Sequence, residues 1–393
     1  MDKSSSDYLF TSVIFGKSVT VLVSLRIFLG MSSETLFLVG FIVFVICILA
    51  IDLNLGRKSG GHVSMKKAGI MSFIVVALAL GFYFILITYG HLLHGITDAE
   101  KLEMIIAKHD HPVQVIPGNY EQSLKLYNQN LGLEYITGYI VEYALSVDNI
   151  FVMIMIFGAF GVAQKNYHRV LFWGILGAII MRFIFIFLGA ALIAKFSWIM
   201  YVFGIFLLIT GVKMFFEKEK EEAIDINNHP IVKFANKYFK VHNQFVGEKF
   251  WVTIDGVKKI TPLFIVLLII EATDLIFAVD SIPAIFLITK DPYIVFFSNI
   301  FAIIGLRSMF FLLAGIIDKF RFLHLGLAVL LVFIGLKMML HGYMEEIGFE
   351  TSHSLLVIVG ILGTSIVASL LFPKSKKERK LKYDPKKDEH LHR

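Results

Sequence analysis

Acidic residues inside apolar segments constrain this chain more than any other feature of its sequence. Residues 269–285 read IIEATDLIFAVDSIPAI, an apolar run that contains Glu271, Asp274 and Asp280. An ionised side chain at the centre of a bilayer costs about 2.5–3.5 kcal/mol on insertion scales, and such residues are most often functional. These acids are therefore expected to face one another, a partner residue or an ion instead of lipid.

A second apolar run repeats this arrangement. Residues 139–152 read YIVEYALSVDNIFV and contain Glu142 and Asp148. Five carboxylates exposed to lipid would together cost on the order of 15 kcal/mol, which is hard to reconcile with a purely structural role. Superimposing the two runs pairs Glu142 with Asp274, Asp148 with Asp280, and Asn149 with Ser281.

Composition and hydropathy predict an all-α membrane protein with many spans. Of the 393 residues, 57% are hydrophobic and only 17% are charged, which is typical of chains that cross a membrane repeatedly. The single cysteine, Cys47, excludes a disulfide framework and a cysteine metal cluster. A span needs about 20 apolar residues. We predict about nine transmembrane helices, at residues 35–53, 70–90, 131–157, 170–194, 198–216, 260–288, 292–317, 323–340 and 354–372.

The distribution of basic residues predicts the orientation of these spans. Lys and Arg cluster in the loops after the first, third and seventh spans, while the loops on the opposite side contain few. Much of the net charge of +6 lies in a basic tail, residues 374–393, expected in the cytoplasm near anionic lipid and not bound to nucleic acid. The N-terminus is therefore expected outside and the C-terminus inside. Residues 1–34 form an extension of uncertain role, and the sequence leaves open whether Met31 is the true start.

Two groups of three spans form an internal repeat within a single transmembrane domain, residues 35–373. Repeat A covers residues 131–216, repeat B covers residues 260–341, and a cytoplasmic linker of mixed charge, residues 217–259, joins them. Three spans per unit force the second unit to insert upside down, which is the 3+3 inverted repeat of secondary transporters, with an ion site near the midplane. Outside the acidic runs, the alignment pairs Arg182 with Arg307, Gly211 with Gly335, and Lys213 with Lys337.

The helical period decides which acids can share a site. Positions six apart are rotated by roughly 120° on a regular helix, so the two acids of each run cannot face the same way. Either they serve different sides of the helix, or the helix is broken between them, as Pro283 would allow in the second run. Asp148 and Asp280 are then expected at the edge of the site or on a gating path. The predicted cluster consists of Glu142, Ser146, Asn149, Glu271 and Asp274.

The charge balance of these segments favours a bound cation. Five acids face two mid-span arginines, Arg182 and Arg307, so about three negative charges remain in a low-dielectric region unless protons or a cation neutralise them. Carboxylate, amide and hydroxyl oxygens suit Mg²⁺, Ca²⁺ or Mn²⁺, whereas Zn²⁺ and Cu⁺ favour imidazole or thiolate. The alternative is a structural network of arginine and carboxylates. Ser281 is a secondary candidate ligand, and Asp52, beside Arg57, is more often a boundary residue.

Other motifs carry weaker signals. His91, His94, His109 and His111 flank or lie in an outside loop, residues 96–130, where solvated surface histidine is expected and metal capture is the alternative. The HExxH motif of zinc proteases and the phosphate-binding GxxxxGK[ST] loop do not occur, which argues against a hydrolase and an ATP-driven pump. No nucleophile–base pair indicates an enzyme, and no cofactor is expected.

At the acidic motifs the sequence resembles the TerC/Alx family of integral membrane proteins, in the LysE-type transporter superfamily. The similarity is close in TGYIVEYALSVDNIFV, EATDLIFAVDSIPAIF and DPYIVFFSNIFAIIGLRSMFFLL, and it runs over residues 35–372; residues 1–30, residues 95–130 and the tail depart from it. The family was named for tellurium resistance, and its members look like exporters of divalent metals, chiefly Mn²⁺. The resemblance implies that the family's acidic positions are Glu142, Asp148, Glu271, Asp274 and Asp280, together with Asn299.

Two functional hypotheses follow. The first is a secondary transporter that moves a divalent cation, chiefly Mn²⁺, outward across a bacterial inner membrane, with carboxylates that alternate between the cation and protons. The second is a membrane assembly or metallation factor that supports partner proteins and transports nothing. An intramembrane enzyme ranks third. Tellurite is an oxyanion and fits an acidic cavity badly, so any link to tellurium resistance is expected to be indirect.

Overall fold

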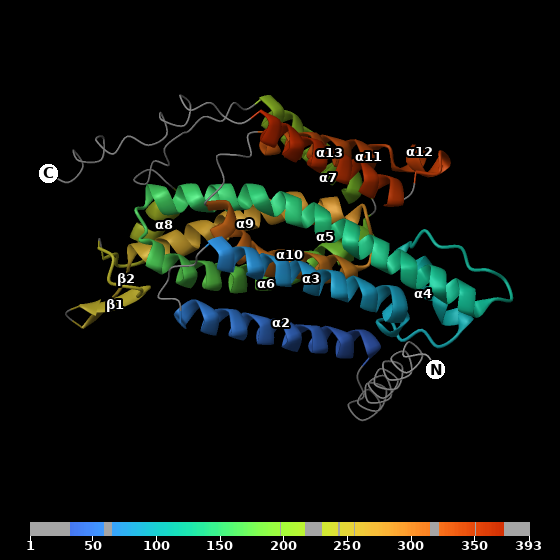
Figure 1. Ribbon diagram of the computed structural model, residues 1–393, viewed down its shortest axis with the longest axis horizontal. Coiled ribbons are helices and arrows are strands. Elements are labelled where there is room, and N and C mark those ends of the chain that lie inside the picture. Colours follow the sequence, from blue (N-terminus) through green and yellow to red (C-terminus); the bar gives the residue numbers. More distant parts are fainter. Residues whose placement is uncertain are drawn as a thin grey trace, which may run out of the picture.

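Long apolar helices make up most of the described chain, as the hydropathy predicts (Figure 1). The computed structural model describes residues 32–58, 65–196, 198–216, 230–242, 244–254, 256–314, 322–349 and 351–372. The expectations for the N-terminal extension up to residue 31, for residues 217–229 of the linker and for the basic tail lie outside these residues.

Each of the nine predicted spans coincides with a helix. These helices are α2 (Ser33–Lys58), α3 (Met65–Tyr89), α5 (Tyr120–Ala159), α6 (Gln164–Lys195), α7 (Ile199–Phe216), α9 (Pro262–Phe286), α10 (Pro292–Ala314), α11 (Leu323–Met339) and α13 (Thr351–Leu371). Within the described residues, six helices are long and apolar enough to cross a membrane, and parts of α7 and α11 form shorter apolar helices. The protein is therefore an all-helical membrane protein, and the count of nine spans stays a prediction.

Helix α10 lies at the centre of the bundle. In its most apolar stretch 94% of the residues are buried, against 17% in α2 and in α13. Helices α3, α5 and α6 pack around it, and Figure 1 shows α7, α11 and α13 gathered on the opposite side of the bundle from α2. Because α10 is enclosed by protein, its polar side chains must find partners within the protein.

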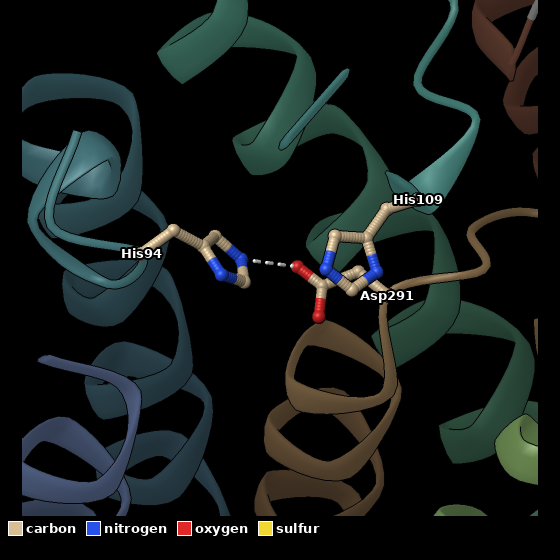
Figure 2. Close-up of side chains that lie close together, drawn as sticks. All are labelled: His94, His109 and Asp291. Atoms are coloured by element: carbon tan, nitrogen blue, oxygen red, sulfur yellow. Dashed lines mark hydrogen bonds and ion pairs between the residues drawn. The ribbon is translucent and has the colours of Figure 1, made fainter. Parts of the chain in front are cut away.

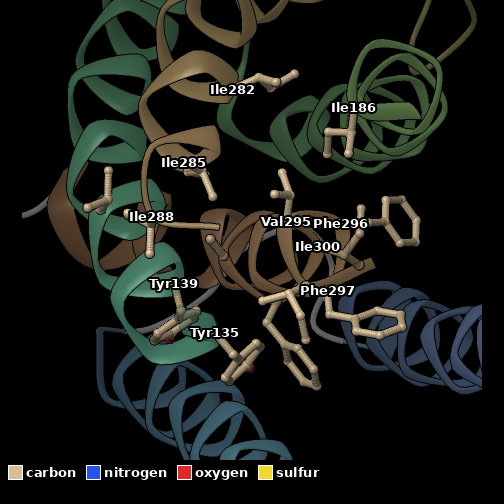
Figure 3. Close-up of a cluster of buried hydrophobic side chains, with 14 of the residues drawn as sticks. Tyr135, Tyr139, Ile186, Ile282, Ile285, Ile288, Val295, Phe296, Phe297 and Ile300 are labelled. Atoms are coloured by element: carbon tan, nitrogen blue, oxygen red, sulfur yellow. The ribbon is translucent and has the colours of Figure 1, made fainter. Parts of the chain in front are cut away.

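Aliphatic and aromatic side chains fill the space around α10. Figure 3 shows Ile282 and Ile285 of α9 close to Val295 of α10, with Tyr135 and Tyr139 of α5 lining the same cluster. The two tyrosine rings stack with centroids 6.4 Å apart. Since lipid is as apolar as these side chains, close van der Waals packing, and not transfer from water, stabilises such contacts inside a membrane.

Helices of the two predicted repeats contact one another in matching pairs. Helix α6 packs on α9, α10 packs on α5, and α7 packs on α11. Gly211 and Gly335, which the repeat alignment pairs, both lie where α7 meets α11. A Cβ atom at Gly211 would lie 2.9 Å from the carbonyl oxygen of Ala328, and one at Gly335 would lie 2.9 Å from that of Gly204. Glycine lets these two backbones approach closely, and the internal repeat stays a prediction.

The region predicted as an outside loop, residues 96–130, is largely helical. After the short 3-10 helix η1 (Gly90–Leu92), the chain forms α4 (Ala99–His109), and α5 already begins at Tyr120. Asp98 caps α4 by accepting a hydrogen bond from the amide of Lys101 at 2.8 Å. Because α4 is short and amphipathic, a search for apolar spans does not detect it.

The described part of the linker contains a short helix and a hairpin. Helix α8 (Pro230–Tyr238) is followed by strands β1 (Trp251–Ile254) and β2 (Val257–Ile260), which pair antiparallel with Trp251 opposite Ile260. The hairpin lies at one end of the bundle and α4 at the other (Figure 1). The all-α class therefore holds for the spans, and a small sheet is added outside them.

Candidate functional site

One buried arginine connects four helices. Arg182 of α6 is 1% exposed, and its guanidinium donates hydrogen bonds to Glu142 of α5, to Asn299 Oδ1 of α10 at 2.5 Å and to Asp274 Oδ1 of α9 at 3.4 Å. All three partners are buried as well. A guanidinium carries five donors and keeps its charge, so it suits a position among several oxygen acceptors. The two acidic runs of the sequence thus meet at Arg182.

Further polar residues lie in rows on α5 and α9, two of the helices that contact this arginine. Asn149 Nδ2 donates to Asp274 Oδ1 at 2.8 Å, which joins the two helices a second time. Glu142, Ser146 and Asn149 are spaced by four and three residues, so they lie on one face of α5. Ser281, two turns beyond Asp274 on α9, is also buried. Each helix therefore presents polar atoms to the protein interior.

Five oxygen atoms of these rows are buried without a hydrogen-bond partner in the described part of the chain. A buried polar atom that loses its hydration and gains no partner costs about 1–3 kcal/mol. Such atoms mark places where a water molecule, a proton or a cation can complete the coordination. The five are Glu142 Oε2, Ser146 Oγ, Asn149 Oδ1, Asp274 Oδ2 and Ser281 Oγ.

Glu271 lies one turn before Asp274 and is half-buried against α6. Its carboxylate packs on Gly177, where a Cβ atom would lie 2.1 Å from Oε1. Glycine therefore leaves the room that this carboxylate occupies. Together with Glu142 and Asp274, Glu271 makes three carboxyl groups on α5 and α9, and Arg182 pairs with two of them. The negative charge of these groups therefore exceeds the positive charge of Arg182 whenever all three are ionised.

The structure describes some of the remaining candidate residues and the course of the helices that carry them. Helices α5 and α9 run without interruption through both acidic runs, and α9 continues past Pro283, so the alternative of a broken helix is wrong. Arg307 is buried on α10, about two turns beyond Asn299. Three candidate side chains lie outside what the structure describes: Asp52, Asp148 and Asp280.

Three of the four histidines expected at the solvated surface are buried, so that expectation is wrong. His94, His109 and His111 are 2%, 5% and 5% exposed. Burial lowers the pKa of His94, but the charge of Asp291 and hydrogen bonds to Asp291 and Glu34 outweigh burial and raise it to about 9. Burial dominates at His109 and lowers its pKa to about 4. Spacing in the sequence does not indicate this burial, because Glu34 and Asp291, the partners of His94, lie far from it in the chain.

Helices that span a membrane around a buried arginine–carboxylate cluster define the class of this protein: a multi-span membrane protein with a polar site inside its bundle. Within this class, the chain belongs to the TerC family. The family model described as "Integral membrane protein TerC family" matches residues 127–378, which include Arg182 and every side chain found to contact it.

Similar proteins cover most of the chain. An uncharacterized membrane protein of Myxococcus xanthus is 42% identical over 332 residues, which are 84% of this chain and 91% of the relative. The putative membrane-bound redox modulator Alx of Escherichia coli (strain K12) is 40% identical over 329 residues, 82% of this chain and 90% of the relative. An uncharacterized membrane protein of Rickettsia bellii is 47% identical over 238 residues, 61% of this chain and 77% of the relative. No solved structure matches the chain significantly.

Proposed function

We propose that this protein is a secondary transporter that exports a divalent cation, Mn²⁺, across a bacterial cell membrane. One observation carries the proposal: five oxygens of carboxylate, amide and hydroxyl groups on α5 and α9 are buried without partners in the described chain, and two of them belong to the carboxylates that contact Arg182. Oxygen ligands of these three kinds suit Mn²⁺, Mg²⁺ and Ca²⁺. The metal is the substrate of the protein and not a resident cofactor.

The charge of the cluster supports a cation in preference to a purely structural network. Arg182 neutralises one of the carboxylates that it contacts, Glu142 and Asp274, and leaves the other to be balanced. In a structural network the acceptor oxygens would be expected to be satisfied by the protein itself. Here each of these carboxylates has one oxygen bound to arginine and one oxygen with no partner among the described residues.

In the proposed transport cycle, the guanidinium of Arg182 competes with the metal ion for the same carboxylates. A metal ion that approaches Glu142 Oε2 and Asp274 Oδ2 weakens the hold of the guanidinium on the same carboxylates, and protonation of either carboxyl weakens it as well. The carboxylates therefore alternate between metal and protons while one repeat rocks against the other and opens the site to each side in turn. In this proposal the N-terminus lies outside and the C-terminus lies in the cytoplasm.

Flux through purified protein tests the proposal. The full chain is reconstituted into vesicles that enclose a Mn²⁺-sensitive dye, and entry of Mn²⁺, Ca²⁺ and Mg²⁺ is compared. Wild-type vesicles are expected to admit Mn²⁺, and Asp274→Asn and Glu142→Gln are expected to reduce the flux by roughly tenfold or more, because each loses a charged ligand.

A matched control separates the site from a general loss of charge. Glu100→Gln makes the same change at an exposed position on α4 and is expected to leave the flux unchanged. Wild-type flux in both Asp274→Asn and Glu142→Gln, with folded protein in the vesicles, would reject the assignment.

The second hypothesis, a membrane assembly or metallation factor, predicts the opposite result: partner proteins co-purify and no vesicle shows flux. The name of the Escherichia coli relative suggests a further hypothesis, a redox modulator. Exchange between a dithiol and a disulfide within one chain needs two cysteines, and this chain has one, Cys47. A direct thiol mechanism in a single chain therefore finds no support in the sequence.

A further inference from the structure

A second group of metal-binding side chains lies at the end of the bundle away from the β1–β2 hairpin. It consists of His94, in the turn after η1, His109, the last residue of α4, and Asp291, directly before α10. Figure 2 shows the three side chains meeting from three separate segments. None of them belongs to the Arg182 cluster, and transport as proposed above does not require them.

The three side chains are close enough to share one ion. One ligand atom from each lies within 4.8 Å of the other two. His94 Nε2 lies 2.9 Å from Asp291 Oδ2, and the rings of His94 and His109 have centroids 5.1 Å apart. His109 Nε2 is buried and has no hydrogen-bond partner among the described residues. An unpartnered buried nitrogen beside a carboxylate is an atom that a metal ion would satisfy.

Neighbouring groups already orient these side chains as metal ligands are usually oriented. Glu34 Oε1 lies 3.1 Å from His94 Nδ1, the arrangement in which a carboxylate fixes a histidine whose other nitrogen binds a metal. The Asp291 Oδ1 atom accepts a hydrogen bond from the amide of Tyr293 at 2.9 Å, so Oδ2 is the oxygen that would exchange its contact with His94 Nε2 for an ion. The site is therefore supported by contacts outside its three members.

His111 extends the cluster on the side of His109. The two rings have centroids 5.8 Å apart, and His111 Nδ1 lies 2.9 Å from Glu134 Oε1. Glu134 in turn accepts a hydrogen bond from Thr289 at 2.6 Å. His111 Nε2 is also buried without a partner in the described part of the chain. Histidine nitrogen is therefore available on two sides of His109.

We propose that His94, His109 and Asp291 bind a divalent first-row transition metal of the Zn²⁺ and Co²⁺ type, at a site separate from the Arg182 cluster. Two imidazoles and one carboxylate are the ligands that such ions favour, and three protein ligands leave coordination positions for water. The oxygen-only set around Arg182 favours harder ions, so the two sites differ in selectivity. A bound metal would tie the end of α3 and α4 to the start of α10, the helix that carries Asn299.

Cobalt is a suitable probe because its visible absorption reports nitrogen and oxygen ligation. The full chain is purified in detergent, stripped with a chelator and titrated with Co²⁺ alone, in a background with His390→Gln and His392→Gln so that tail histidines do not compete. The protein is expected to bind one Co²⁺ with visible bands that Zn²⁺ displaces. His109→Gln and Asp291→Asn are expected to lower the affinity by roughly tenfold or more.

Two controls separate this site from others. His353→Gln removes an exposed histidine of α13, and Asp274→Asn alters the Arg182 cluster; both are expected to keep the Co²⁺ bands. Retention of the bands and of wild-type affinity in both His109→Gln and Asp291→Asn overturns the proposal, as does loss of the bands in Asp274→Asn alone. X-ray absorption of the Co²⁺-loaded protein, with only the two tail histidines replaced, gives a test that does not depend on whether the site variants fold. A spectrum without imidazole ligands also overturns the proposal. Failure of flux in the vesicle assay leaves this result untouched.

Discussion

At the scale of single residues, Arg182 is the side chain whose removal is expected to affect the stability of the cluster most. Its charge is balanced by Glu142 and Asp274, and its Nη1 also donates to Asn299. Breaking a buried ion pair by removing one partner leaves an uncompensated charge, whereas exposed pairs contribute little. The cluster is therefore held together by one guanidinium that contacts several acceptor side chains, and not by a set of independent ion pairs.

Arg182→Met is expected to destabilise the protein by about 3–5 kcal/mol, because two carboxylates then lie buried without a counter-charge. Thermal unfolding in detergent, followed by size-exclusion chromatography, measures the effect. Arg169→Met makes the same change at a side chain that is 41% exposed and pairs with Glu248 at 3.8 Å, so it is expected to cost less than about 1 kcal/mol. Equal melting temperatures for the two variants would contradict a central role for Arg182.

The sequence could identify the acids of the cluster but not all of their contacts. Carboxylates in apolar runs are visible by composition alone, and the repeat alignment pairs Glu142 with Asp274 before any coordinates are known. Which arginine meets them depends on how α6 and α10 rotate about their axes, and hydropathy does not fix that rotation. The buried histidines were missed for a related reason, since polar residues near loops are most often solvated.

At the scale of elements, α7 and α11 depend on glycine for their close approach. Gly211→Ala is expected to cost about 1–3 kcal/mol, because the added Cβ would lie 2.8 Å from Val332 N, a backbone atom that cannot turn away. Gly335→Ala is expected to cost as much, since its Cβ would lie 2.7 Å from Leu208 N. Melting temperature in detergent measures both.

A glycine outside any close contact provides the matched control. A Cβ atom at Gly363 of α13 meets nothing within 4 Å, and alanine favours helix over glycine by up to about 1 kcal/mol. Gly363→Ala is therefore expected to be neutral or slightly stabilising. If the melting temperatures of Gly211→Ala and Gly335→Ala match that of Gly363→Ala, the close backbone contact between α7 and α11 is contradicted.

Gly177 tests whether the packing of α6 positions an acid of α9. An alanine there would collide with the Glu271 carboxylate, which can rotate away at small cost in stability but leaves its position. Under the proposed function, Gly177→Ala is expected to lower Mn²⁺ flux by roughly tenfold, close to the effect of Glu271→Gln. The vesicle assay measures both, with Gly363→Ala as control. Wild-type flux in Gly177→Ala would remove Glu271 from the ion path.

Elements were predictable where they are long and apolar. All nine expected spans coincide with helices because a span of about 20 apolar residues has few alternatives in a membrane. Helix α4 was not predictable in this way, because its stability comes from a cap at Asp98 and from burial of Leu102 and Ile105 under neighbouring segments. The cluster at His109 depends on that helix, so missing the element also hid the site.

At the scale of the whole molecule, the two ends of the bundle are chemically different. The hairpin end carries exposed Lys258 beside Trp251, and the α4 end carries the buried histidines. If the orientation follows the basic loops, the hairpin faces the cytoplasm and α4 faces outside. Export would then move a cation from an end rich in basic side chains, past the Arg182 cluster, toward the end that holds His94 and Asp291.

Cysteine labelling in whole cells tests this orientation. With Cys47 replaced by alanine, a single cysteine is placed on α4 as Glu100→Cys or on the hairpin as Lys258→Cys, both exposed positions. A maleimide that cannot cross membranes is expected to label Glu100→Cys in intact cells and Lys258→Cys only after permeabilisation, because the two positions lie at opposite ends of the bundle (Figure 1). Labelling of Lys258→Cys alone in intact cells would place the hairpin outside and α4 in the cytoplasm. Labelling of both in intact cells would contradict a bundle that spans the membrane along its long axis, so the experiment tests the orientation of the protein together with its fold.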